Sequence, residues 1–103
     1  MNAPTTEKAG SDQVLRALAM LELLCGELPA GMTNKDIAAA LNVPPSYVTR
    51  TAETLIVKGW VERTPEGRFR VTTRFSRLSF RVLQAFEKAS TRLDDMRRNY
   101  TLG

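Results

Sequence analysis

Two adjacent prolines, Pro44 and Pro45, lie between two stretches whose apolar residues recur at helical spacing. A proline inside a helix removes a backbone hydrogen bond, and its ring clashes with the preceding turn. The two stretches therefore cannot form one continuous helix. Pro44 pushes Val43 toward an extended conformation, whereas Pro45 fits the first turn of a new helix, where no N–H donor is needed. The sequence predicts two short helices joined by a turn.

Both helices have residues suited to their ends. Thr33 begins a Thr-x-x-acid pattern that ends at Asp36, which is typical of a helix N-terminus. Asn42 suits the left-handed conformation that ends a helix, and Gly59 is a natural residue just after a helix end. The second helix is predicted over 45–58, and the pair forms a helix-turn-helix. Its inward-facing apolar residues are Val48, Ala52, Leu55 and Ile56.

The residues before this pair predict one more helix. Apolar residues recur at helical spacing from Ser11 or Asp12 to about Cys25. Cys25 is the only cysteine, so an internal disulfide is impossible, and its place in an apolar run predicts a buried thiol. Residues 1–10 contain no hydrophobic segment of the kind found in secretory signals, and we expect them to form a disordered tail.

A β-hairpin is predicted over 60–72, directly after the helix-turn-helix. Pro65-Glu66-Gly67 supplies a tight turn, and Phe69 and Val71 alternate with arginines on the strand that follows. Because a helix, a helix-turn-helix and a hairpin occur in this order, we expect a winged helix-turn-helix domain over 11–73. The predicted fold is mainly α with a small β-hairpin, followed by a long C-terminal helix.

The C-terminal helix, predicted over 74–103, carries apolar residues in alternating steps of four and three from Phe75 to Tyr100. Two interpretations remain open: the helix packs on its own domain, or it pairs with a copy of itself. Twenty residues of helix span about 30 Å, which is farther than a small domain covers, so we favour dimerisation. The predicted dimer contacts are Val82, Phe86, Ala89, Leu93 and Met96.

Charge and composition narrow the classes of function. The net charge is +4, and six arginines between Arg63 and Arg81 face a single acid, Glu66, so the basic character is local and suggests an anionic partner. The chain has no histidine, no phosphate-binding glycine loop and no metal-ligand spacing, so we expect neither an enzyme nor a cofactor. No stretch approaches the about 18 apolar residues of a membrane span, so no membrane partner is expected.

Four segments, at consistent distances from one another, match a motif known from DNA-binding proteins. They cover the first helix, the second helix, the turn with the helix 45–58 (the recognition helix), and the start of the hairpin (the wing). They are Arg16-Ala17-Leu18 with Leu21 and Leu24, Met32 to Leu41, Asn42 to Arg50, and Leu55 to Arg63. Together they make residues 13–73 resemble the DNA-binding half of the IclR type of bacterial transcription regulator. Pro45 departs from the polar or basic residue common in that family. The family's C-terminal effector domain has no counterpart, so no small-molecule effector is expected within this chain.

The helix-turn-helix presents polar residues to a DNA duplex. With the apolar face of the recognition helix turned inward, its first turns can enter the major groove, and Arg50 suits a bidentate contact to guanine. Free amides at the start of the preceding helix attract phosphate, and the basic face of the hairpin can add backbone or minor-groove contacts. The predicted DNA-binding residues are Thr33, Asn34, Lys35, Ser46, Tyr47, Thr49, Arg50, Arg68 and Arg70.

We therefore expect a transcriptional regulator that binds specific double-stranded DNA as a homodimer, in the cytoplasm at the nucleoid. The recognition helix 45–58 would occupy the major groove, and the wing 60–72 would contact the backbone or minor groove. Two alternatives remain open. The recognition helix holds only Arg50 and Lys58 against Glu53, so the module could instead bind protein or RNA. It could also be an architectural or accessory DNA-binding protein without a regulatory role.

Overall fold

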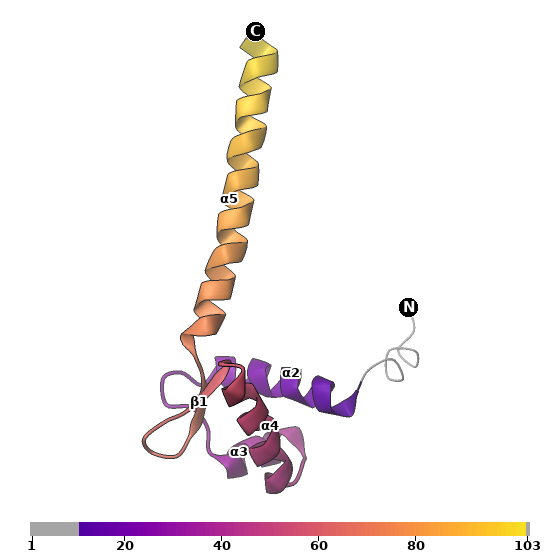
Figure 1. Ribbon diagram of the computed structural model, residues 1–103, viewed down its shortest axis with the longest axis vertical. Coiled ribbons are helices and arrows are strands. Elements are labelled where there is room, and N and C mark those ends of the chain that lie inside the picture. The colour runs from indigo at the N-terminus through magenta and orange to yellow at the C-terminus, as the bar shows by residue number, and fades with distance from the viewer. Residues whose placement is uncertain (1–10, 103) are drawn as a thin grey trace. The chain divides into compact units, whose positions relative to one another are not determined.

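The structure, a computed structural model, describes residues 11–102 (Figure 1). The predicted tail over 1–10 lies outside the described residues. The chain divides into two units, one ending at Thr72 and the other beginning at Thr73. The elements are α2 (Asp12–Cys25), α3 (Asn34–Leu41), α4 (Pro45–Val57), β1 (Val61–Arg63), β2 (Phe69–Val71) and α5 (Thr73–Leu102). The predicted winged helix-turn-helix followed by a long C-terminal helix is confirmed.

The turn between α3 and α4 forms as the two prolines require. Asn42 takes the left-handed conformation, with φ 57° and ψ 51°, and so ends α3. Pro44 is extended, with φ −66° and ψ 150°, and Pro45 is the first residue of α4. At the other end of α4, Gly59 has a φ of 82°, which suits a glycine after a helix end. The double proline therefore separates two short helices rather than damaging one.

Side-chain caps begin both helices that precede the turn. The Thr33 hydroxyl accepts a hydrogen bond of 3.1 Å from the backbone N–H of Asp36, as the Thr-x-x-acid pattern predicts. The Ser11 hydroxyl accepts one of 3.2 Å from the N–H of Gln13. Each hydroxyl satisfies an amide that has no partner inside its own helix.

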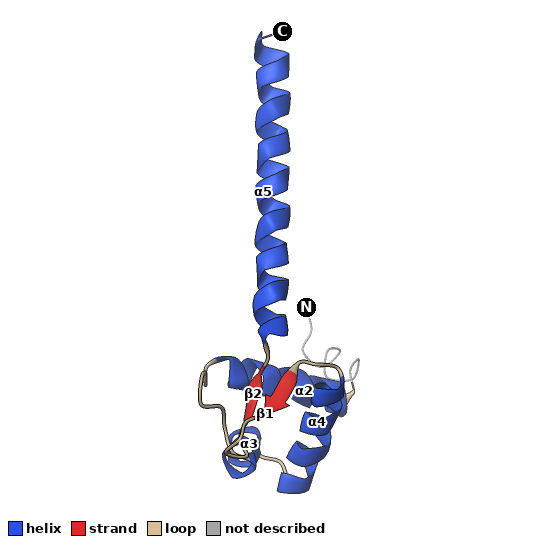
Figure 2. Ribbon diagram, turned by 60° about the vertical axis from the view of Figure 1, so that its left-hand side comes forward, coloured by secondary structure: helices blue, strands red, loops and turns tan. Residues whose placement is uncertain are grey.

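β1 and β2 form an antiparallel hairpin, the predicted wing, which Figure 2 shows in red. Val61 pairs with Val71 across the hairpin, and Arg63 pairs with Phe69. Met32, just before α3, exchanges two backbone hydrogen bonds of 2.8 and 2.9 Å with Phe69 and so adds a bridge to the outer side of β2. The wing is therefore tied by its backbone to the start of the helix-turn-helix.

One hydrophobic core holds the first unit together. α2 packs against α3, α4 and β2, and apolar side chains from all five elements of the unit meet between them. Only the second half of α2 takes part, because Val14 and Leu18 near its start are 56% and 54% exposed. The predicted burial of the Cys25 thiol is wrong: Cys25 is exposed, since it is the last residue of α2, beyond the packed face. The most deeply buried side chains are Met20, Leu24, Ile37, Val48, Val61 and Phe69.

Gly31 lets the loop before α3 approach the wing closely. Its φ is 80°, and a Cβ at this position would overlap the carbonyl oxygen of Phe69. Any side chain here would therefore strain the local backbone and push the loop away from β2. The glycine is needed for the bridge between the loop and the wing.

The second unit is a single helix of 30 residues, α5. All its side chains from residue 79 to residue 101 are exposed, including Phe86 at 71%. An ion pair between Arg98 and Asp95 lies along its surface. In the described part of the chain, neither α5 nor any other helix is long and apolar enough to cross a membrane.

Candidate nucleic-acid interface

Three of the predicted contact residues on the first turns of α3 and α4 are exposed. Ser46 and Arg50 on α4 are exposed, and so is Lys35 on α3. The starts of the two helices are joined, because Asn34 donates a hydrogen bond to the backbone carbonyl of Pro45. The exposed groups near the starts of these two helices are therefore a hydroxyl, a guanidinium and an ammonium group.

Asn34 and Thr49, also predicted to contact DNA, are bonded to each other. The Asn34 side-chain nitrogen donates to Thr49 Oγ1 at 2.8 Å and to the carbonyl oxygen of Pro45 at 3.1 Å. Thr49 Oγ1 in turn donates to the same carbonyl at 3.2 Å. Because a carbonyl can only accept, the amide nitrogen rather than its oxygen must face Pro45. The three groups form a brace between α3 and α4, which we call the Asn34–Thr49 brace.

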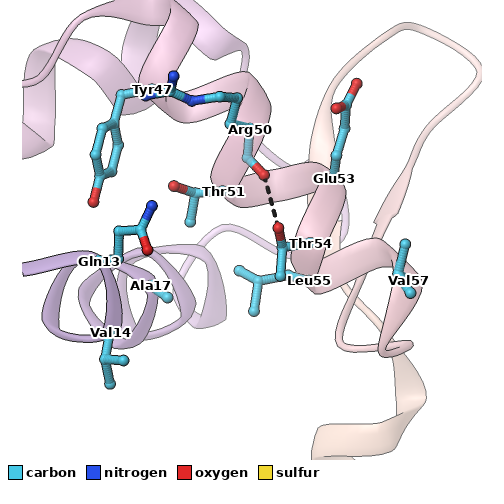
Figure 3. Close-up of a pocket in the computed structure, with 10 residues that line it drawn as sticks. All are labelled: Gln13, Val14, Ala17, Tyr47, Arg50, Thr51, Glu53, Thr54, Leu55 and Val57. Atoms are coloured by element: carbon cyan, nitrogen blue, oxygen red, sulfur yellow. Dashed lines mark hydrogen bonds between the residues drawn. The ribbon is translucent and has the colours of Figure 1, made fainter. Parts of the chain in front are cut away.

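Tyr47 is directed toward α2 rather than toward solvent. Two guanidinium groups lie over its ring, that of Arg16 at 5.0 Å and that of Arg50 at 5.7 Å from the ring centre. Its hydroxyl is buried and has no hydrogen-bond partner in the described part of the chain. Figure 3 shows the ring beside Gln13 of α2. Tyr47 is therefore placed to support Arg50, and Arg16 is a member of this cluster that the sequence did not identify.

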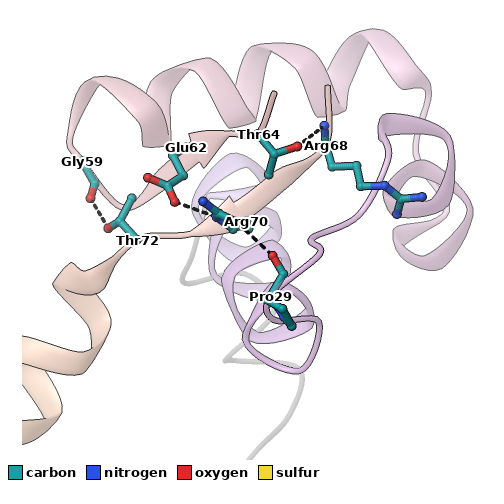
Figure 4. A network of polar contacts seen from close by, with 7 residues as sticks. All are labelled: Pro29, Gly59, Glu62, Thr64, Arg68, Arg70 and Thr72. Atoms are coloured by element: carbon teal, nitrogen blue, oxygen red, sulfur yellow. Dashed lines mark hydrogen bonds and ion pairs between the residues drawn. The ribbon is translucent and has the colours of Figure 1, made fainter. Parts of the chain in front are cut away.

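The wing arginines that were predicted to contact DNA are partly engaged within the domain. Arg70 Nε forms an ion pair of 2.7 Å with Glu62, and its Nη1 donates to the carbonyl of Pro29 at 3.1 Å (Figure 4). Arg68 donates to the carbonyl of Gly31 at 3.3 Å. A guanidinium has five N–H donors, so both groups retain donors for another partner.

Arg63 is a wing residue that the set of predicted DNA contacts did not include. It is exposed at the end of β1, and its guanidinium lies 4.6 Å from the centre of the Phe69 ring. The hairpin register explains this contact, since Arg63 and Phe69 are directly opposite each other. The same register places Glu62 opposite Arg70. Both pairs, Arg63 with Phe69 and Glu62 with Arg70, can be predicted once the strand pairing is known.

A groove lies between α2 and α4, next to Arg50 (Figure 3). Val14 and Ala17 line it from α2, while Leu55 and Val57 line it from α4. Arg50 and Glu53 supply charged groups to the same groove. In residues 11–102, no three Cys, Asp or Glu side chains gather as metal ligands would.

The predicted dimer contacts lie on α5. Val82, Phe86 and Leu93 are all more than half exposed, and Met96 is 46% exposed. Residues three and four positions apart lie on the same face of a helix, so these side chains form one apolar stripe. Among the described residues of its own unit, which are those of this helix alone, no other element covers these side chains.

Comparison with known proteins identifies a family and a fold. The family model described as the IclR helix-turn-helix domain matches residues 13–65, which include all four segments that carried the sequence resemblance. Among solved structures, the chain is similar to an IclR family transcriptional regulator from Brucella abortus. That match has 21% identity and a TM-score of 0.63, and it covers 75% of this chain and 29% of that one.

At this identity the structural likeness shows the fold alone, and the chain spans less than a third of that regulator's length. A search of curated proteins gave no match. The family match to residues 13–65 therefore carries more information about function than the structural neighbour does.

Proposed function

The chain belongs to the IclR helix-turn-helix domain family, and from this membership we propose that it binds specific double-stranded DNA as a homodimer and regulates transcription at the nucleoid. The observation that carries the proposal is the exposed polar surface where α3 and α4 begin. Ser46, Arg50 and Lys35 reach solvent there, on the part of a helix-turn-helix that approaches a duplex.

Arg50 is proposed to recognise a base. It lies in the second turn of α4, and its guanidinium can donate two parallel hydrogen bonds to the O6 and N7 atoms of guanine in the major groove. The Tyr47 ring, 5.7 Å away, limits the orientations that the guanidinium can take. Because fewer orientations are lost on binding, Tyr47 contributes to affinity without touching DNA.

Lys35 and Ser46 are proposed to contact phosphate. Both lie in the first turn of a helix, where backbone N–H groups without intrahelical partners already attract an anion. Contacts of this kind fix the position of the domain on the duplex and do not depend on base sequence. They would hold α4 in the groove while Arg50 contacts a base edge.

Thr33, Asn34 and Thr49 are assigned to positioning in this proposal. Their side-chain polar atoms cap α3 or form the Asn34–Thr49 brace, so they set the angle between α3 and α4. Direct contact of these three residues with DNA stays a prediction. A loss of DNA affinity without a loss of stability would indicate direct contact.

On the wing, the proposal keeps Arg68 and Arg70 as backbone contacts and adds Arg63. Arg68 and Arg70 have guanidinium donors beyond those that are bonded within the domain. Arg63 is exposed and held over the Phe69 ring. A wing with three cations near one strand pair would contact DNA phosphates. The contribution of the wing to DNA affinity should therefore fall steeply as the salt concentration rises.

α5 is proposed to supply the homodimer through Val82, Phe86, Ala89, Leu93 and Met96. Burying a row of exposed apolar side chains on a matching row is the main favourable term in such an association. A twofold dimer presents two recognition helices, so the target site should be a pseudo-palindrome.

The proposal is tested by selecting random DNA duplexes with the purified protein and then titrating variants on the selected site. Arg50→Ala is expected to weaken binding by about 1–3 kcal/mol and to relax the preference at one base position. Lys58→Ala is the matched control, because Lys58 is exposed at the opposite end of α4 and its loss removes the same charge. The control should leave the base preference unchanged.

Three outcomes would contradict the proposal. Duplex binding that is undetectable at low salt would exclude DNA as the partner. Equal losses for Arg50→Ala and Lys58→Ala, with unchanged base preference, would mean that α4 contributes charge and no recognition. A preference for RNA over duplex DNA in a mixed selection would favour the RNA-binding alternative.

A further inference from the structure

The stripe on α5 is made of two sets of positions that alternate along the helix. In a heptad repeat these are the positions a and d, which meet in the centre of a pair of helices. Position a holds Ser79, Phe86, Leu93 and Tyr100, whereas position d holds Phe75, Val82, Ala89 and Met96. Each set therefore contains large side chains and at least one small one. Because of this mixture, a parallel pair and an antiparallel pair of helices would pack differently.

A parallel pair would place like residues together. Each a or d residue would then meet the same residue of the second copy, so Phe86 would meet Phe86 and Ala89 would meet Ala89. Large layers such as those of Phe86 and Leu93 would then adjoin the small layer of Ala89, which leaves space. Uneven layers of this kind pack poorly, because a core tolerates neither voids nor crowding.

Charges beside the stripe also disfavour a parallel pair. Arg92 and Arg97 occupy the flanking positions g and e, which face each other across a parallel pair five residues apart. Each Arg92 would lie opposite Arg97 of the second copy, and symmetry makes this repulsion occur twice. The segment 74–81, with three arginines and no acid, would also lie beside itself.

An antiparallel pair removes both conflicts. In the register that pairs the exposed stripe positions from Ser79 to Met96, Phe86 meets Ala89 of the second copy and Ser79 meets Met96. Val82 then meets Leu93, so each of these three layers combines a larger side chain with a smaller one.

The flanking charges fit the same register. In an antiparallel pair, g positions face g positions and e positions face e positions. Arg92 would then lie near Ala85 of the second copy, and Arg97 near Ser76. The basic segment 74–81 would lie beside segment 94–101 of the second copy, in which two aspartates balance two arginines.

We propose that the α5 helices of two copies pair antiparallel, in the register that sets Phe86 against Ala89 of the second copy. This inference rests on the homodimer of the proposed function, and it specifies which α5 residues of one copy contact which α5 residues of the other. The two Thr73 residues would then lie at opposite ends of the pair, about 44 Å apart along its axis at 1.5 Å per residue. The two DNA-binding units are therefore attached at opposite ends of the coiled coil.

Cysteine cross-linking tests the orientation. The exposed Cys25 is first replaced in Cys25→Ser, and Ser79→Cys and Met96→Cys are made separately in that background. When the two variants carry different tags and are co-expressed, mild oxidation should link one to the other, and neither should link to itself. Gln84→Cys, on the exposed outer face of α5, is the control and should form no link.

A charge reversal gives an independent measurement. In a parallel pair, Arg92→Glu would turn two repulsive pairs into attractive ones and tighten the dimer about tenfold, from the usual size of such pairs. In the antiparallel pair, residue 92 faces Ala85, so the dimer dissociation constant should change by less than about twofold. Sedimentation equilibrium measures the dimer dissociation constant of Arg92→Glu and of the protein without substitutions.

The outcomes separate this inference from the proposed homodimer. Links between Ser79→Cys and Met96→Cys, with no self-links, support the antiparallel pair. Self-links of either variant, or a dimeric mass with no links at all, overturn it and leave the homodimer standing. A monomeric mass for the protein without substitutions overturns both.

Discussion

The Asn34–Thr49 brace gives the sharpest test of how the helix-turn-helix is held together. Asn34→Ala removes an amide nitrogen that donates at 2.8 Å to Thr49 and at 3.1 Å to the Pro45 carbonyl. Thr49→Val keeps the shape of the side chain and removes the hydroxyl from the same cluster. Because both changes act on one bond, their effects should not be additive.

The expected magnitudes follow from the bonds that each change removes. A hydrogen bond within a protein contributes about 0.5–1.5 kcal/mol net, so the two bonds of Asn34 are worth about 1–3 kcal/mol. Asn34→Ala also relieves a buried carbonyl oxygen that has no partner among the described residues, and alanine is the better helix former. We therefore expect a net loss of about 1–2 kcal/mol for Asn34→Ala and about 1 kcal/mol for Thr49→Val.

The assay is urea unfolding followed through the fluorescence of Trp60, the only tryptophan of the chain. The double variant should be about 1 kcal/mol less destabilised than the sum of the two single variants, which is the free energy of the shared bond. Thr54→Val is the control, because its hydroxyl donates only to the Arg50 carbonyl on the exposed side of the same helix. The control should cost less than about 0.5 kcal/mol.

Two results would refute the reasoning. Additive losses, with a coupling energy below about 0.3 kcal/mol, would mean that the two side chains do not share a bond. Unchanged stability of Asn34→Ala combined with weaker DNA binding would mean that the amide contacts DNA and does not brace α3 against α4. The same pair of measurements therefore decides between a positioning role and a direct contact.

Three further predictions concern the wing loop, the dimer and the wing itself. Gly31→Ala should lower the free energy of unfolding by at least about 2 kcal/mol, because the φ of residue 31 is 80° and the alanine Cβ would overlap the Phe69 carbonyl oxygen. A loss below about 1 kcal/mol in urea unfolding would contradict this close approach. Phe86→Glu should give a monomer by sedimentation, and an unchanged mass would exclude the α5 stripe. Arg70→Ala should weaken binding to all duplexes alike and make affinity less dependent on salt concentration. The variant also loses the half-exposed ion pair with Glu62, which should lower the free energy of unfolding by at most about 1 kcal/mol. A loss of affinity that depends on DNA sequence would refute a phosphate role for Arg70.

The helix-turn-helix could be predicted from sequence because its determinants are local. Pro44 and Pro45 restrict backbone angles within one or two residues of themselves, and so does the left-handed Asn42 that precedes them. The Thr33 cap likewise depends on a residue three positions away. Such constraints act whatever the rest of the chain does, so the bounds of α3 and α4 follow from them.

The directions of polar side chains could not be predicted in the same way. Asn34 and Thr49 are fifteen residues apart, and a helical-wheel argument places each on a polar face without saying what lies opposite. Once α3 and α4 are docked, those faces meet and the two groups bond to each other. The same reason applies to Arg70, whose partner carbonyl, that of Pro29, is 41 residues away.

The cluster of Arg16, Tyr47 and Arg50 is another long-range contact, and it bears on the role proposed for Arg50. Pro45 removes a polar or basic side chain from the start of α4, so Arg50 is the cation of its exposed first turns. Two guanidinium groups lie near the Tyr47 ring, at 5.0 and 5.7 Å from its centre, and their mutual repulsion weakens the hold of the ring on Arg50. Both arginines are exposed, but Arg50 lies on α4, the helix proposed to enter the major groove, whereas Arg16 lies on α2. Replacing Arg16 with glutamine should therefore strengthen the hold of the ring on Arg50, leave the guanidinium fewer orientations to lose on binding, and raise the preference for the selected site over unrelated duplexes. A lower preference for the selected site in the duplex titration would refute this coupling.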